Sequence, residues 1–199
     1  HLCYNNREDN QIEKKLIWNF CYRLDIPLYN YDISHIKRSN INRERYEKIT
    51  RNLRFKCYKL IDCPIVLGHI YEDKIENIFT NLSTNKHIFN LQKMKFISVI
   101  QDIIIIRPFI NTKKSIIYEY AHIFKIPYLN DTTPTWSNRG KFRDQFLKSY
   151  IKQYEKGTDN LVKVAENLEN YGELIQESII QPYVNQLIQG NDILFTPSI

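Results

Sequence analysis

The stretch Pro64-Ile65-Val66-Leu67-Gly68-His69-Ile70-Tyr71-Glu72-Asp73-Lys74-Ile75-Glu76-Asn77 decides the fold class of this chain. Its first part, residues 64–68, is a wholly apolar run that ends at a glycine, which is typical of a central parallel strand buried on both faces. Its second part begins with carboxylates and has neither glycine nor proline, which predicts a helix over about 72–82. A buried strand that leads directly into a helix is part of a β–α–β unit.

The segments on either side repeat this alternation of strand and helix. Ile103 to Ile106 is a second buried strand, followed by a helix over 113–124. Upstream, apolar residues predict helices over about 10–24 and 43–60, and an alternating pattern predicts a strand over 28–34. The sequence therefore predicts an α/β protein with an open, mainly parallel, Rossmann-like sheet. Ligands of such sheets bind at the carboxyl ends of the strands.

Length and composition set the domain organisation. The chain has 199 residues, of which 43% are hydrophobic and 25% charged, and these values suit one globular domain, or one domain with a small appendage. We expect an α/β domain over 1–155 and a purely helical segment over 156–199. No apolar run approaches the roughly 20 residues that cross a bilayer. Because the chain starts at His1, we expect its true amino terminus to be missing.

The cysteines and the charges indicate the surroundings and the class of partner. Four cysteines without a C-x-x-C pair predict neither a zinc site nor a disulfide framework, and they favour a cytoplasmic protein. Residues 35–60 carry nine lysines and arginines against two glutamates, and residues 139–152 carry five against one aspartate. From Glu155 onward the charge is mainly acidic. Two basic patches favour a nucleic acid or nucleotide as partner, although a solvated helix face would have the same pattern.

Acidic residues follow the first buried strand directly. His69, Glu72, Asp73 and Glu76 come just after Gly68, which permits close approach of a ligand to the backbone. Carboxylates at this edge of a sheet could bind Mg²⁺ for phosphate chemistry. Alone they could be ordinary partners of a helix dipole, but their position at the carboxyl end of a central strand favours a ligand site.

A second group of charged residues lies on a later helix. A turn-rich loop over 130–138 leads into a helix that carries Arg139 and Arg143 one turn apart. Two arginines on one face can bind successive phosphates through paired hydrogen bonds. The alternative is a salt bridge from these arginines to the acidic cluster or to Asp144.

Together these segments resemble the PP-loop ATP pyrophosphatase superfamily and, within it, the tRNA(Ile)-lysidine synthetase family. Residues 1–7 resemble the second strand of that family, and residues 47–55 are similar to its E-x-x-A-R-x-x-R-Y helix. Residues 69–77 match its H-H-x-D-D-Q-x-E-T segment at His69, Asp73 and Glu76, whereas Ile70, Glu72, Lys74 and Asn77 depart from it.

Two later motifs extend the resemblance. Residues 107–109 resemble the family's R-P-L motif, and Asp131 with residues 138–143 resembles its D-P-S-N followed by R-N-x-x-R, with Gly140 in place of the second Asn. The S-G-G-x-D-S nucleotide loop of the superfamily follows its first strand, and no copy of it occurs in these 199 residues. Either the protein cannot bind ATP in the manner of the family, or the chain is a fragment whose α/β domain lacks its first strand and loop and which is inactive alone; we expect the fragment.

The resemblance implies a fold like that of the adenine nucleotide alpha hydrolases and a two-step reaction. ATP would adenylate the wobble cytidine of a tRNA, with Mg²⁺ present and pyrophosphate released, and the amine of free lysine would then displace AMP. The implied catalytic residues are Asp73, Glu76, Glu72 and His69, with Asp73 and Glu76 also on the Mg²⁺. The implied phosphate or tRNA contacts are Arg7, Arg51, Arg54, Arg107, Arg139 and Arg143.

Two other functions remain open. The first is tRNA thiolation within the same superfamily, although such enzymes generally use paired cysteines, an iron–sulfur cluster or zinc, and Cys57 and Cys63 are separated by five residues. The second is a non-catalytic tRNA-binding module that has kept the fold and the basic patches.

Overall fold

The computed structural model describes residues 1–4, 10–33, 36, 41–129 and 137–190. These residues form two compact units, which are described separately. The first unit comprises His1–Gly68 and Phe96–Pro134, and the second comprises His69–Lys95 and Thr135–Ile199. Both units are defined by packing, and the division of the sequence at residue 155 stays a prediction.

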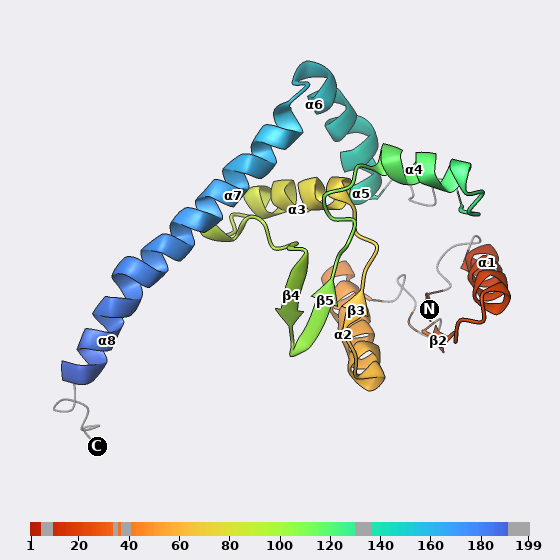
Figure 1. Cartoon of the computed structure of the whole chain (residues 1–199), viewed down its shortest axis with the longest axis horizontal. Coiled ribbons are helices and arrows are strands. Elements are labelled where there is room, and N and C mark those ends of the chain that lie inside the picture. Colours follow the sequence, from red (N-terminus) through yellow and green to blue (C-terminus); the bar gives the residue numbers. More distant parts are fainter. Residues whose placement is uncertain (5–9, 34–35, 37–40, 130–136, 191–199) are drawn as a thin grey trace. The chain divides into compact units, whose positions relative to one another are not determined.

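A three-stranded sheet is the centre of the first unit. Strands β3 (Ile65–Val66) and β5 (Ile103–Ile106) are parallel, and β4 (Ile97–Ile100) pairs antiparallel with β5, which gives the order β3-β5-β4. Helix α2 (Arg43–Ile61) lies beside this sheet (Figure 1) and packs Phe55 and Tyr58 against it. The helix itself lies where the spacing of apolar residues predicts it, but the stripe inferred from that spacing is not the face that meets the sheet, since Leu60 at its end is 84% exposed.

The two strands that we predicted to be buried on both faces are each buried on one face only. Ile65 and Ile105 lie against α2, whereas Val66 is 64% exposed and Ile104 is 45% exposed. Successive side chains of a strand point to opposite faces of the sheet. The prediction was wrong because the face that carries Val66 and Ile104 has little packed over it in the described part of the chain.

A tight turn joins β4 to β5. Gln101 and Asp102 both have positive φ angles, 52° and 66°, as the two central residues of a type I′ hairpin turn require. This backbone suits the twist of the two strands although neither residue is a glycine or an asparagine. The antiparallel strand β4 makes the sheet mixed rather than wholly parallel.

The remaining elements of the first unit include a small second sheet. Strands β1 (Leu2–Cys3) and β2 (Tyr31–Asp32) pair in parallel, so the strand predicted over 28–34 is shorter than expected. Helix α1 (Asn10–Arg23) separates them along the chain, and α4 (Lys114–Ile123) follows β5. Both helices occur where the sequence predicts them.

The second unit is helical in its described part. Helix α3 (Tyr71–Ser83) packs beside α7 (Gly157–Ile175), and a core of apolar residues between its helices contains Ile75, Ile78, Leu147 and Val162. A short 3₁₀ turn, Ile88–Asn90, lies against α7. Figure 1 shows that α7 continues through a π-helical segment, Gln176–Ile180, into α8 (Gln181–Gly190) as one long helix.

The helix predicted to carry Arg139 and Arg143 is present, whereas residues 130–136 of the loop predicted before it lie outside the described residues. Helix α5 (Asn138–Lys141) continues through a π-helical segment, Phe142–Leu147, into α6 (Lys148–Gln153). Ser137 caps this helix by accepting a hydrogen bond from the Gly140 backbone N–H at 3.0 Å. The cap fixes where the helix begins, and hence the direction in which Arg139 and Arg143 project.

Candidate functional site

Helix α3 positions the two carboxylates of the candidate site. It begins three residues after Gly68, and Asp73 lies in its first turn. Asp73 Oδ2 accepts a hydrogen bond from the Ile70 backbone N–H at 3.0 Å, which satisfies a donor at the start of the helix. Glu76 lies one turn further along, so both carboxylates lie on one face of α3.

The two arginines reach these carboxylates from α5 and the π-helical segment. Arg143 Nη2 donates to Asp73 Oδ1 at 2.7 Å, and Arg143 Nε donates to Glu76 Oε2 at 3.4 Å. Arg139 binds the same two oxygen atoms: its Nη2 contacts Asp73 Oδ1, and its Nε donates to Glu76 Oε2 at 3.1 Å. We call these four residues the carboxylate–arginine cluster.

Burial differs between the members of this cluster. The side chain of Asp73 is 9% exposed and that of Arg143 is 22% exposed, whereas that of Arg139 is 48% exposed. The cluster holds two positive and two negative charges, so its net charge is zero. Arg139 is therefore the member that an incoming anion can reach most readily, since a guanidinium binds phosphate and carboxylate with the same paired geometry.

The carboxylates of the cluster do not fit a Mg²⁺ site as they stand. Mg²⁺ needs oxygen ligands in near-octahedral geometry, but Asp73 Oδ1 and Glu76 Oε2 are each bound by two arginines. Among the described residues, no group of three or more histidines, cysteines, aspartates or glutamates is arranged to hold a metal ion. The arrangement is instead the salt bridge that the sequence left open as an alternative.

Two other predicted residues lie near the start of α3. His69 precedes the helix and is half-buried, and Glu72 is half-buried in its first turn. Both belong to the second unit, as the cluster does. Their catalytic roles stay predictions.

The remaining predicted arginines belong to other parts of the chain. In the first unit, Arg51 is exposed with its guanidinium 4.8 Å from the centre of the Phe55 ring, and Arg54 Nη2 donates to the Tyr4 hydroxyl at 3.0 Å. Arg107 is only 4% exposed and donates from Nη1 to Ser98 Oγ at 2.8 Å. Burial lowers the pKa of its guanidinium. Arg7 and Asp131 lie outside the described residues.

Two polar contacts beside the cluster were not predicted. The Tyr71 hydroxyl donates to Asp159 Oδ1, and burial together with this hydrogen bond raises the pKa of Tyr71 well above its ordinary value. The buried Lys74 binds Glu166 Oε1 at 3.1 Å. Both contacts join α3 to α7. The two residues of the Tyr71–Asp159 pair are 88 positions apart in the chain, and those of the Lys74–Glu166 pair are 92 apart. No local sequence pattern indicates such distant pairs.

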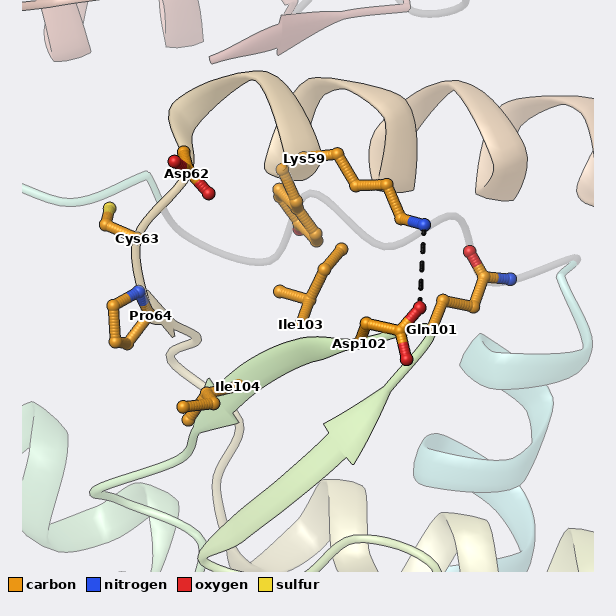
Figure 2. Close-up of a pocket in the computed structure, with 9 residues that line it drawn as sticks. Lys59, Asp62, Cys63, Pro64, Gln101, Asp102, Ile103 and Ile104 are labelled. Atoms are coloured by element: carbon orange, nitrogen blue, oxygen red, sulfur yellow. Dashed lines mark ion pairs between the residues drawn. The ribbon is translucent and has the colours of Figure 1, made fainter.

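A hollow of about 450 Å³ in the first unit lies at the opposite edge of the sheet from the expected ligand site. Figure 2 shows Cys63, Pro64, Asp102 and Ile103 around it, with Lys59 Nζ 4.0 Å from Asp102 Oδ2. These residues lie just before β3 and at the start of β5. Because ligands of open α/β sheets bind at the carboxyl ends of the strands, we do not assign this hollow to the nucleotide.

Comparison with known proteins defines the class. Residues 1–151 match the PP-loop domain, and the chain belongs to this family. The resemblance stated from the motifs is thereby confirmed, as is a Rossmann-like fold of the adenine nucleotide alpha hydrolase type. The PP-loop family is a family of ATP-binding domains.

The relatives most informative about activity modify tRNA. The chain is 25% identical to the tRNA(Ile)-lysidine synthase of Mycoplasma mycoides subsp. mycoides, over 93% of this chain and 47% of that protein. It is 26% identical to the tRNA(Ile)-lysidine synthase of Mesoplasma florum, over 98% of this chain and 51% of that protein. The chain thus spans about half the length of these relatives.

A solved structure shares the fold. The U34-tRNA thiolase NcsA from Methanococcus maripaludis, solved with its 4Fe–4S cluster, superposes with a TM-score of 0.63 at 14% identity, over 85% of this chain and 61% of that one. This likeness concerns the fold alone. Among the described residues, no helix is long and apolar enough to span a membrane.

Proposed function

We propose that this protein is an ATP-dependent tRNA-modifying ligase that adenylates the wobble cytidine of a tRNA and joins lysine to it, to form lysidine. The relatives named lysidine synthase support this substrate pair, and the basic residues of α2 support a tRNA partner. The carboxylate–arginine cluster is the observation on which the proposal rests. Cytoplasmic localisation stays part of the proposal.

In the first step, the C2 oxygen of the cytidine forms a bond to the α-phosphorus of ATP and pyrophosphate leaves. Negative charge builds on the phosphoryl oxygens, so cationic donors aimed at them lower the barrier. The half-exposed Arg139 is the group we assign to this task. Arg143, which is more buried, keeps Asp73 and Glu76 in place while Arg139 binds the phosphate.

In the second step, the lysine amine forms a bond to C2, the C2–O bond breaks, and AMP leaves with the electron pair. The amine loses a proton as the new C–N bond forms. Once Arg139 has turned to the phosphate, Asp73 Oδ1 and Glu76 Oε2 keep Arg143 as a partner and each has room for one further donor, such as the amino group of lysine. The same two carboxylates would therefore hold the second substrate after they have released the first arginine.

We assign no step to Mg²⁺, because arginines occupy both carboxylates that the resemblance gives to it. His69 and Glu72 stay candidates for orienting the nucleotide at the start of α3.

Thiolation is the second candidate, and a tRNA thiolase has the same fold. Sulfur transfer generally needs a cysteine pair or a cluster. Cys57 lies on α2 and Cys63 follows that helix, and no group of three metal-ligating residues occurs in the described part of the chain. The third candidate is a tRNA-binding module without catalysis. Only a measurement of enzymatic activity distinguishes it from the ligase and the thiolase.

The test measures transfer of radioactive lysine to tRNA(Ile) by the complete protein, together with the release of pyrophosphate. Arg139→Ala should slow pyrophosphate release about a hundredfold, as loss of one donor to an oxyanion does. Lys141→Ala is the matched control. Lys141 is exposed and lies on α5 two residues from Arg139, and its substitution removes the same positive charge. We expect its rate to change less than twofold.

Each outcome separates the three candidates. Lysine in the RNA, with the Arg139 effect, supports the ligase. Sulfur incorporation without lysine would establish the thiolase in its place. Tight tRNA binding with neither product would leave the non-catalytic module. Equal effects of Arg139→Ala and Lys141→Ala would remove the cluster from the chemistry.

A further inference from the structure

Helix α1 carries a pair of stacked aromatic rings on its surface. The ring centroids of Trp18 and Tyr22 are 5.3 Å apart, and the planes of the two rings differ by only 6°. Trp18 is 55% exposed and Tyr22 is 75% exposed. Neither residue belongs to the hydrophobic clusters of its unit, so their packing does not hold the fold together.

The same face of α1 is cationic. At about 100° per residue, Lys14 and Lys15 lie four and three positions before Trp18 and share its side of the helix. Glu13, the only carboxylate of α1, lies on the opposite side. The stacked pair is therefore next to two lysines, with no acidic residue of the helix between them.

We infer that Trp18 and Tyr22 form a stacking platform for an unpaired base of the tRNA, with Lys14 and Lys15 beside the flanking phosphates. This inference rests on the proposed tRNA substrate. A base stacks on the open face of an aromatic ring whatever its sequence, and lysines bind the backbone next to it. The alternation of flat rings and cations suits a nucleotide, whereas a protein helix docking here would meet lysines where it needs apolar neighbours.

The test compares tRNA binding by three forms of the full chain at fixed salt. Trp18→Leu/Tyr22→Leu keeps apolar side chains but removes both rings, and we expect the dissociation constant to rise about tenfold. Trp18→Phe/Tyr22→Phe keeps two rings at the same positions, and we expect it to bind within threefold of the wild type. Because Leu is a good helix former, the Leu variant should melt at the wild-type temperature.

A second readout follows Trp18 directly. The sequence has two tryptophans, so Trp136→Phe leaves Trp18 as the single reporter. We expect tRNA to quench its fluorescence, and the quenching to saturate with the dissociation constant measured by binding.

The outcomes distinguish this inference from the proposed function. If the wild type binds no tRNA, the proposed function is wrong and the platform has no ligand. If the wild type binds tRNA and the Leu variant binds equally well, the platform is wrong while the proposed function stands. Equal weakening by the Leu and Phe variants, or quenching that depends on protein concentration instead of tRNA, would also overturn it.

Discussion

Asp73 has two tasks in this structure. One of its oxygens caps the start of α3 through the Ile70 N–H, and the other accepts both arginines of the cluster. The side chain is nearly buried, so each lost partner would leave a polar group with little water around it. Its effects on the fold and on the chemistry must therefore be separated by experiment.

Asp73→Ala should destabilise the second unit by about 2–4 kcal/mol. The change removes a hydrogen bond to the helix start and leaves Arg143, which is largely buried, with only its longer contact of 3.4 Å to Glu76. The free energy of unfolding from urea titrations measures the loss. Asp144→Ala is the control, because Asp144 forms only an exposed pair with Lys148 at 3.1 Å and should cost less than about 1 kcal/mol. If both variants lost the same free energy of unfolding, the contacts of Asp73 would stabilise the fold no more than an exposed salt bridge does.

Asp73→Asn separates the two tasks. The amide oxygen can still accept from the Ile70 N–H, so the helix start is kept, but the negative charge that positions Arg139 is lost. We expect at least half of the stability lost in Asp73→Ala to return, while pyrophosphate release is abolished in both variants. Wild-type release by Asp73→Asn would place the chemistry elsewhere.

At the scale of elements, a glycine sets how closely the 3₁₀ turn approaches α7. A Cβ added to Gly172 would lie 2.6 Å from Phe89 Cβ, which is too close for any real contact. Phe89 lies in that turn, and its Cβ is held by the backbone. Gly172 therefore permits the two elements to pack together.

Gly172→Ala should lower the free energy of unfolding by about 1–3 kcal/mol, as overpacking of a filled site does. The sign is informative because alanine in a helix otherwise stabilises by about 1 kcal/mol relative to glycine. Gly68→Ala is the control, because nothing lies within 4 Å of a Cβ added there. Calorimetry of both variants measures the difference. A more stable Gly172→Ala variant would mean that Phe89 moves aside freely.

The helices and the two apolar strands could be predicted because their patterns are local. Helix α2 follows from its spacing of apolar residues, and β3 and β5 follow from short apolar runs. Strand β4 could not be predicted, since Gln101-Asp102 lacks the Asn-Gly or Asp-Gly pattern of a type I′ turn. Burial on both faces was a wrong prediction because burial depends on what covers a sheet, which no strand sequence contains.

The sequence was sufficient to predict which residues belong to the candidate site, but not which of them bind one another. Asp73, Glu76, Arg139 and Arg143 were selected by motif and by the position of the carboxyl edge. That all four meet in one cluster depends on the packing of α5 against α3, across more than sixty positions of the chain. Lys74 shows the same limit, since its partner Glu166 lies on α7.

At the scale of the whole molecule, the net charge of +6 is unevenly distributed. The exposed side of α2 presents Arg45, Lys48 and Lys56 away from the residues that pack on the sheet. Lys156, the N-cap residue of α7, and Lys163, in the second turn of that helix, lie among acidic residues. If tRNA binds through phosphate contacts on α2, charge lost there must weaken binding more than the same charge lost on α7.

The salt dependence of tRNA binding measures this difference. Each phosphate contact contributes about 0.7–0.9 to the slope of log K against log salt concentration. Arg45→Ala/Lys48→Ala should therefore make the slope shallower by about 1–2 units. Lys156→Ala/Lys163→Ala removes the same net charge from exposed positions on α7, and we expect its slope to match that of the wild type. Equal shifts in both double variants would mean that the tRNA responds to total charge and that α2 has no docking surface for it.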